Sequence, residues 1–236
     1  MDPRHKRKIG VMGSASGPTA RDPDGQQLAL ELGRQIARAG CILINGACPG
    51  LPDRAAEGAK REGGFVFGVS PAFSLEEHVQ VYASPIEHYD MILYSGMGLM
   101  ERDIVNIRSA DAVVIVGGGV GTLNEFTVAY EERKPVGVLT GTGGISDHLD
   151  EILQFAHRKA GPDRVIYDGD PARLVERLLA LVERSKPPMR ESEVGGVAET
   201  MQGSEALQAA HHAQRRARDA DKQRSAEEES GGGEPE

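Results

Sequence analysis

The sequence predicts an α/β fold: a Rossmann-like, open and mostly parallel sheet with helices on both faces, in three layers. From Lys8 to about Arg184, short apolar runs of strand length alternate with stretches whose apolar residues recur at helical spacing. The strand-like runs are apolar throughout, which is typical of strands buried on both faces of a parallel sheet. Loops rich in glycine and serine follow several of these runs, at the edge where such sheets bind ligands.

Each element of this fold is marked by its own pattern. Strands are expected where apolar and β-branched residues run together, at residues 9–13, 41–44, 65–69, 91–94, 112–116, 136–139 and 165–167. Helices are expected where apolar residues recur every three or four positions, at residues 26–39, 51–61, 99–108, 123–132, 148–159 and 171–183. Gly40 and Gly63 end the first two helices. Pro71 is expected to begin a long loop.

Both ends of the chain differ in composition from this core. Residues 1–7 are basic and are expected to form a flexible arm. Residues 185–236 are rich in Glu, Arg, Ala and Ser, contain few apolar residues and include a closing run of glycines. Such a composition predicts a disordered, charged tail of low complexity. The ligand-binding domain is therefore expected to span residues 8–184.

The charge and composition of the chain argue against several classes of function. A net charge of −9 and a pI of about 5.3 disfavour nonspecific binding of nucleic acid, which needs clustered Lys and Arg. Cys41 and Cys48 have neither the spacing of a metal site nor that of a disulfide framework, so we expect no metal and a reduced, cytoplasmic setting. No apolar run reaches the roughly 18 residues of a membrane helix, so we expect no membrane association.

The most informative stretch is VGGGVGTLNE at residues 116–125, directly after an apolar strand. Glycines let backbone amides approach a ligand closely, and together with the N-terminus of the following helix they form a site for an anion. Thr122 and Glu125 also match the capping box, in which two side chains satisfy free amides at a helix start. The two interpretations are compatible, since a capping threonine can also touch phosphate. The predicted phosphate-binding residues are Gly118, Gly119, Gly121 and Thr122.

This stretch is similar to the Pro-Gly-Gly-x-Gly-Thr-x-x-Glu signature of the LOG ("lonely guy") phosphoribohydrolases, which were once labelled lysine decarboxylases. The upstream MGLMERDIVNIRSADAVV resembles the family helix that carries Met-x-x-Arg-Lys. KIGVMGSASG resembles the family's first strand and loop, and FVFGVSP its third strand. KPVGVLTGTGGISDHLDEILQFA resembles the strand and helix that follow the signature. The likeness spans about residues 8–184.

By this resemblance, Glu125 falls on the family's catalytic glutamate and Arg102 on its catalytic arginine. Family enzymes cleave the N-glycosidic bond of a nucleoside 5′-monophosphate and release free base and ribose 5-phosphate. A carboxylate suits this chemistry because it stabilises an oxocarbenium-like state and activates water, and arginine orients anions. The phosphate supplies binding energy remote from the reacting bond. The resemblance implies no required cofactor, a small phosphorylated ligand as partner, and a homodimer.

Two positions depart from the LOG signature and keep a second function open. Gly117 stands where the signature has proline, and Asp103 stands where it has lysine. An aspartate adds a negative charge near an anionic substrate, which is unfavourable. Both features look more like a neighbouring branch of the fold, which includes molybdenum-cofactor carrier proteins. Under that alternative the chain binds a phosphorylated pterin (the molybdenum cofactor) or a signalling nucleotide without changing it.

Small and polar residues in the first two loops complete the predicted site. Ser14 follows the first strand, and Asn45 and Gly46 follow the second, at the same edge of the sheet as the glycine loop. Each could contact a ligand or serve only the local turn, since serine, asparagine and glycine are frequent turn residues.

Overall fold

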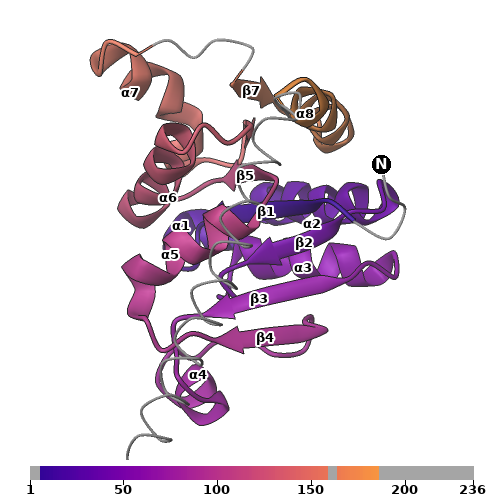
Figure 1. Ribbon diagram of the computed structural model, residues 1–236, viewed down its shortest axis with the longest axis vertical. Coiled ribbons are helices and arrows are strands. Elements are labelled where there is room, and N and C mark those ends of the chain that lie inside the picture. The colour runs from indigo at the N-terminus through magenta and orange to yellow at the C-terminus, as the bar shows by residue number, and fades with distance from the viewer. Residues whose placement is uncertain (1–5, 159–163, 186–236) are drawn as a thin grey trace, which may run out of the picture. The chain divides into compact units, whose positions relative to one another are not determined.

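The computed structural model describes residues 6–158 and 164–185 of the chain and confirms the predicted α/β fold. Seven strands of the described residues form one sheet, and every pair of neighbours is parallel. The strands are β1 (Lys8–Gly13), β2 (Ile42–Asn45), β3 (Val66–Ser70), β4 (Met91–Tyr94), β5 (Ala112–Val116), β6 (Val136–Leu139) and β7 (Val165–Asp168). Their order across the sheet is β4-β3-β2-β1-β5-β6-β7 (Figure 1).

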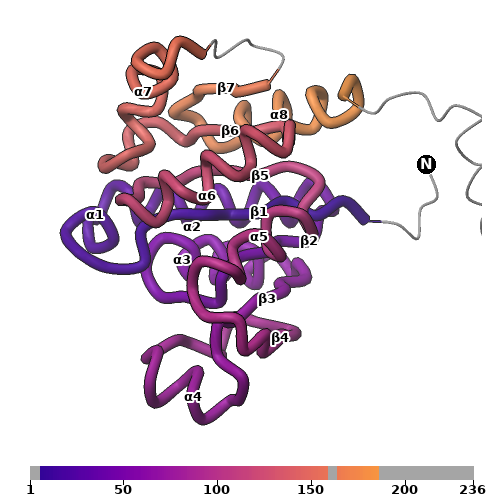
Figure 2. Tube along the Cα trace, turned by 60° about the vertical axis from the view of Figure 1, so that its left-hand side comes forward, coloured from indigo at the N-terminus to yellow at the C-terminus, as the bar shows by residue number. Residues whose placement is uncertain are grey.

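Helices cover both faces of the sheet, so the described residues form the three layers that the sequence predicts. The helices are α1 (Gly17–Arg21), α2 (Pro23–Arg38), α3 (Leu51–Arg61), α4 (Leu75–Gln80), α5 (Gly98–Ser109), α6 (Val120–Glu131), α7 (Leu149–Phe155) and α8 (Pro171–Ser185). A 3₁₀ helix, η1 (Gly144–His148), precedes α7. α2, α3 and α8 pack on one face, and α5, α6 and α7 on the other (Figures 1 and 2).

The core is divided by the sheet because successive side chains of a strand point to opposite faces. In β5, Val114 and Val116 belong to the core on the α2 side, whereas Val113 and Ile115 belong to the core on the α6 side. All of these side chains are fully buried, which accounts for the uninterrupted apolar run in the sequence. Each contributes about 1.5–3 kcal/mol to stability relative to exposure.

The order of the strands reverses between β1 and β5. From β1 the chain builds outwards through β2 and β3 to β4, and it then crosses back to place β5 beside β1. Open sheets of this kind bind ligands in the crevice outside the carboxyl ends of the strands at such a switch. Gly13 pairs with Val116 at the ends of β1 and β5, so the loops that leave these strands begin side by side.

The predicted start of the first long helix is too late, and α1 was not predicted. α2 begins three residues before the predicted start, at Pro23, because the Asp22 carboxylate accepts a hydrogen bond from the Gly25 amide at 2.7 Å and caps the helix. Proline suits the first turn of a helix because its missing amide would have no partner there. Pro18 stands in the first turn of α1 for the same reason.

The prediction of a long loop after Pro71 is wrong in part, because this segment contains the helix α4. The Ser74 hydroxyl accepts from the Glu77 amide at 3.2 Å, and the Glu77 carboxylate accepts from the Phe73 amide at 2.7 Å. Two side chains thus satisfy amides at the start of this helix, in the manner of a capping box. α4 lies beyond β4 at the end of the sheet (Figure 2).

β4 is the exception to the prediction that the strands are buried on both faces. It is one of the two edge strands of the sheet, and its Met91 and Leu93 are 54% and 42% exposed. An edge strand with exposed apolar side chains is unusual in a soluble monomer, because it invites association with another chain. The apolar run in the sequence does not reveal this, since strand order alone decides which strand lies at the edge.

The predicted arm at residues 1–7 and tail at residues 185–236 lie almost entirely outside the described residues. The helix predicted at residues 148–159 is too long: α7 ends at Phe155, residues 156–158 are described and not helical, with His157 at φ +52°, and only residue 159 lies outside the described residues. Within the described ranges, no helix is long and apolar enough to cross a membrane.

The crossing of α2 and α3 leaves no room for side chains at two glycines. A Cβ atom at Gly33 would lie 1.8 Å from the Ala55 carbonyl oxygen, and one at Gly58 would lie 1.9 Å from the Leu30 carbonyl oxygen. We expect Gly58→Ala to lower the free energy of unfolding by roughly 2–4 kcal/mol, because the helices must move apart. Denaturant titration measures this change. Gln27→Ala, on the exposed side of α2, is the control, and equal effects of both substitutions would contradict the tight crossing.

Candidate functional site

A pocket of about 430 Å³ opens at the carboxyl edge of the sheet, between the loops that follow β1 and β5. The first turns of α5 form another wall, and the loop after β2 contributes one residue. The pocket therefore lies at the switch in strand order, where the sequence predicts a ligand. The residues that line it are Gly13, Ser14, Ala15, Ser16, Thr19, Cys48, Leu99, Met100, Arg102, Asp103, Gly118, Gly119, Gly121, Thr122 and Glu125.

The N-terminus of α6 supplies backbone amides for an anion. Its N-cap residue is Gly119, and no side chain of the described residues caps this helix. The amides of residues 119–122 have no acceptor within the helix and carry the positive end of its dipole. At Gly119 and Gly121 nothing lies within 4 Å of the place where a Cβ would stand, so a ligand can approach this backbone closely.

The two preceding glycines hold the loop in place. The Gly118 amide donates to the Ser14 hydroxyl at 2.6 Å, and the Gly117 amide donates to the Thr142 hydroxyl at 2.8 Å. Both amides are occupied within the protein, so Gly118 contributes to the pocket through its small size. Its φ is +104°, and a Cβ there would lie 2.4 Å from the Thr122 Cβ, which only glycine avoids.

Thr122 and Glu125 do not form the predicted capping box. α6 begins at Val120, three residues before the predicted start, so both residues lie inside the helix and on one face of it. The Thr122 side chain lies close enough to the Glu125 carboxyl group to lower its pKa. Glu125 projects into the pocket about 4.5 Å along the helix axis from Thr122, just beyond the free amides.

The carboxyl group of Glu125 is mostly protonated at neutral pH. Burial among protein atoms raises its pKa, and the charge of Asp103 raises it further, to about 8. The Arg102 guanidinium and the Thr122 hydroxyl oppose this shift without cancelling it. Carboxyl groups with pKa values perturbed in this way are frequent at catalytic and binding sites.

Arg102 lies in the pocket wall with unused hydrogen-bonding capacity. Its side chain is 6% exposed, and its Nη1 lies 3.5 Å from the Asp103 carboxylate. Its Nε has no hydrogen-bond partner among the described residues. A Cβ at Gly46 would lie 2.0 Å from Nη1, so the guanidinium rests against the backbone of the loop after β2. Arg102 can therefore donate to a ligand or to a carboxylate in the pocket.

Asp103 faces the same pocket rather than solvent. The residue is 5% exposed, and the side chain of Asn124 on α6 lies close enough to its carboxyl group to lower its pKa. Burial raises the pKa of Asp103, while Arg102 and Asn124 limit the increase. This end of the pocket thus combines one guanidinium with two carboxyl groups. A phosphate is better accommodated at the other end, beside the free amides of α6.

Two of the predicted contact residues do not line the pocket, whereas the others meet in it. Asn45 is fully buried, and its side chain donates to the Pro52 carbonyl at 2.9 Å and accepts from the Ala47 amide at 2.8 Å. Gly46 packs against the Arg102 guanidinium. Both residues shape the loop after β2, and direct contact of either with a ligand stays a prediction.

The sequence prediction missed several residues of the pocket. Leu99 and Met100 at the start of α5 are 56% and 53% exposed and form an apolar rim. Cys48 lies deeper, where burial raises the pKa of its thiol to about 12 and keeps it neutral. Thr19 comes from α1. The position of Cys48 in the loop after β2 could have indicated that it lines the site. Leu99 and Met100 could not be predicted, because apolar residues on a helix normally belong to the core.

Histidines and cysteines do not gather into a metal site in the described ranges, which contain no group of three or more side chains able to hold a metal ion. His78 is fully buried and has a structural role. Its Nδ1 lies 2.8 Å from the Ser70 hydroxyl, and its Nε2 lies 3.0 Å from the Pro85 carbonyl oxygen. His78 thus joins α4 to the end of β3.

The profile of the SLOG cluster4 family matches residues 6–175, which include the whole sheet and every residue that lines the pocket. The chain belongs to the SLOG cluster4 family. The match is in keeping with the resemblance to LOG phosphoribohydrolases and to molybdenum-cofactor carriers.

Relatives of this SLOG protein carry two kinds of name. A protein of Oryza sativa subsp. japonica named "probable cytokinin riboside 5′-monophosphate phosphoribohydrolase" is 30% identical over 173 residues, which are 70% of this chain and 68% of that one. The solved molybdenum cofactor carrier protein of Chlamydomonas reinhardtii is 31% identical, with a TM-score of 0.61 over 75% of this chain and 99% of that one. The molybdenum cofactor binding protein of Rippkaea orientalis is 26% identical, with a TM-score of 0.61 over 75% and 98%.

Ionisation of Glu125 is expected to lower the free energy of unfolding as the pH rises. Its pKa of about 8 in the folded chain lies above the ordinary 4.5, so the cost is absent below about pH 4.5 and grows until the group is ionised above pH 8. We expect Glu125→Gln to raise the free energy of unfolding by roughly 2–4 kcal/mol at high pH and by little at pH 4. Denaturant titrations across this pH range measure the difference.

Glu131→Gln is the matched control for this experiment, because Glu131 is exposed on the same helix. It should show no comparable dependence on pH. A gain from Glu125→Gln that is the same at every pH would contradict the raised pKa.

Proposed function

We propose that this SLOG protein is a LOG-type phosphoribohydrolase, which cleaves the N-glycosidic bond of a nucleoside 5′-monophosphate into free base and ribose 5-phosphate. The placement of Glu125 supports this most. Its carboxyl group lies in the same pocket as the free amides of α6, on the next turn of the same helix. A phosphate at those amides brings the attached sugar to the carboxyl group. The name of the rice relative agrees with this reaction.

The phosphate would be bound by backbone amides and hydroxyl groups together. The amides of residues 119–122 lie at the start of α6, Ser14 and Ser16 line the pocket from the loop after β1, and Thr19 lines it from α1. The Ser14 oxygen already accepts from the Gly118 amide, which leaves its own proton free to donate. These contacts fix the ligand without touching the bond that breaks, and their binding energy orients the sugar.

Glu125 acts in this reaction as a carboxylate. Departure of the base leaves positive charge on the anomeric carbon, which an ionised carboxyl group stabilises while it activates the attacking water. With a pKa of about 8, about one tenth of the molecules carry ionised Glu125 at pH 7. Arg102 favours the ionised form and orients it, through donors that the protein leaves unused. The reaction requires no cofactor.

A second function, carriage of a phosphorylated ligand without catalysis, is supported by a different observation. The solved relatives are named for the molybdenum cofactor, and Asp103 places a carboxylate where LOG enzymes have lysine. The free amides of α6 suit the phosphate of a pterin as well as that of a nucleotide. In that case Arg102 and Glu125 would hold the ligand and leave it unchanged.

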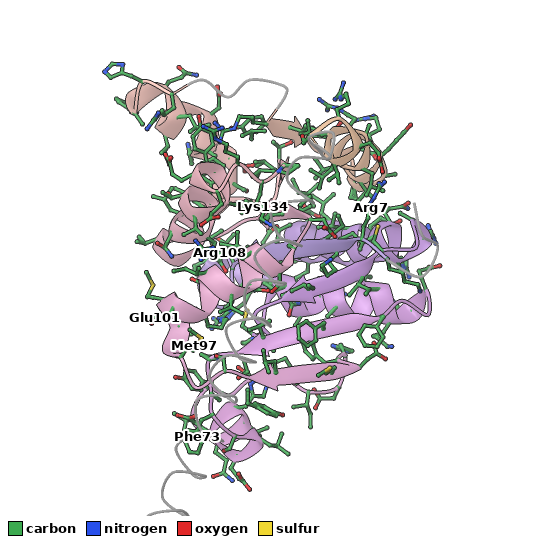
Figure 3. The ribbon with its side chains drawn as sticks, in the orientation of Figure 1. Arg7, Phe73, Met97, Glu101, Arg108 and Lys134 are labelled. Carbon is green, nitrogen blue, oxygen red and sulfur yellow. The ribbon has the colours of Figure 1, made fainter. Side chains whose placement is uncertain are left out.

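We also propose that the chain pairs with a second copy through the surface formed by β4 and the start of α5, here called the β4–α5 face. Met97, Met100 and Ile104 recur along one side of α5 and are all at least 40% exposed. Met91 and Leu93 of β4, the strand that precedes α5 in the chain, are exposed as well. Figure 3 shows Met97 projecting at the start of α5. Apolar surface of this extent is typical of a protein–protein interface. A partner here would cover the apolar rim of the pocket.

The proposed reaction predicts a specific dependence on pH. Incubation with a panel of nucleoside 5′-monophosphates should release free base, which chromatography detects. We expect kcat/KM to rise about tenfold per pH unit below pH 8 and to level off above it, because only ionised Glu125 supports the reaction. Glu125→Gln should lower the rate by about 10²–10⁴-fold above pH 8, and the difference should narrow as the pH falls.

Glu131→Gln should retain full activity and serves as the control. Saturable binding of a phosphorylated ligand with no base released from any nucleotide would sink the hydrolase and favour the carrier. A pterin absorbance in the purified protein would favour the carrier as well. Undiminished release of base by Glu125→Gln would show that another group performs the chemistry.

The proposed pairing can be tested apart from the chemistry. Ile104→Glu puts a charge into the β4–α5 face, and we expect it to convert a dimer into a monomer in sedimentation or light-scattering measurements. Phe155→Glu is the control, because Phe155 is an exposed apolar residue on α7, away from that face. A native chain that remains monomeric at high concentration would contradict the pairing.

A further inference from the structure

Asp103 is a charged group of the pocket that has no role in the proposed reaction. Its carboxylate lines the pocket and the residue is only 5% exposed. Its partners in the described chain are the Arg102 guanidinium, 3.5 Å away, and the side chain of Asn124. An ionised carboxylate has about four acceptor positions, so Asp103 keeps acceptor capacity in a buried place. These acceptor positions face the pocket, where the donors of a ligand can reach them.

The position of Asp103 in the pocket limits which part of a ligand supplies them. Its charge acts directly on Glu125, and its partner Asn124 precedes Glu125 on α6. The region bordered by Glu125 and Asp103 lies beyond the free amides of α6, where the sugar of a bound monophosphate would be. The 2′- and 3′-hydroxyls of ribose are adjacent donors, and carboxylates bind them in the same way in dinucleotide sites.

We propose that Asp103 accepts hydrogen bonds from the 2′- and 3′-hydroxyls of the ligand's ribose and thereby makes the pocket selective for ribonucleotides over 2′-deoxyribonucleotides. This inference rests on the proposed nucleotide site. A deoxy sugar loses a hydrogen bond to a charged acceptor and leaves that acceptor partly unpaired in a buried place. The same negative charge repels the phosphate, so it also fixes the direction in which the ligand enters.

The test uses probes that do not depend on the unknown base. Calorimetry of the full chain with ribose 5-phosphate, 2-deoxyribose 5-phosphate and inorganic phosphate gives three affinities. We expect ribose 5-phosphate to bind about tenfold or more tightly than its deoxy counterpart. In Asp103→Asn, which preserves the shape of the side chain, this ratio should fall to about two or less. The affinity for inorganic phosphate should be retained or slightly increased, which also shows that the variant is folded.

Each other outcome has a definite meaning. Equal affinity of the native chain for the two sugar phosphates overturns the inference, and it leaves the proposed phosphate site intact. No binding of phosphate or ribose 5-phosphate overturns the proposed function, and this inference with it. If Asp103→Asn still prefers ribose 5-phosphate, another group binds the hydroxyls, and this result also overturns the inference. Equal affinities in the native chain overturn the inference even if Asp103→Asn does not fold, and in that case Asp103→Ser, also uncharged, replaces it in the comparison of the two ratios.

Discussion

The hydrogen bond from the Gly118 amide to the Ser14 hydroxyl joins the two loops on which the pocket depends. β1 and β5 pair along their length, so their loops begin at a fixed separation, and this bond then sets how the glycine loop turns. The Leu51 amide donates to the Ser14 carbonyl at 2.9 Å, which brings the loop after β2 to the same residue. Because the bond occupies the Gly118 amide, the amides that remain for a ligand are those at the start of α6.

The charges of the pocket determine how readily Glu125 ionises. Arg102 is shared between two carboxyl groups, so it neutralises neither of them fully. A lysine in place of Asp103, as in the LOG signature, would lower the pKa of Glu125 and favour its ionised form. With aspartate there, the carboxyl group holds its proton more firmly and works under a narrower range of conditions. The residue next to Arg102 thus determines how readily Glu125 ionises.

Comparison of two similar motifs shows what the sequence could and could not predict. Ser74 and Glu77 share the spacing of Thr122 and Glu125, but only the first pair caps a helix. The glycines before α6 turn the chain so that the helix starts at Val120, and this depends on contacts with the loops after β1 and β6. Apolar runs predicted the strands well because burial by a sheet is a local pattern. Strand order, loop contacts and the exposure of β4 depend on residues far apart in the chain.

The tight crossing of α2 and α3 has a consequence for motion. Helices whose backbones touch at Gly33 and Gly58 cannot slide past one another, because neither surface has side chains that could rearrange. The loops that lead into these helices form the side of the pocket near Ser14, so that side behaves as one rigid body. Any change in shape when a ligand enters must therefore come from the opposite side, where α5 begins with the exposed Leu99 and Met100.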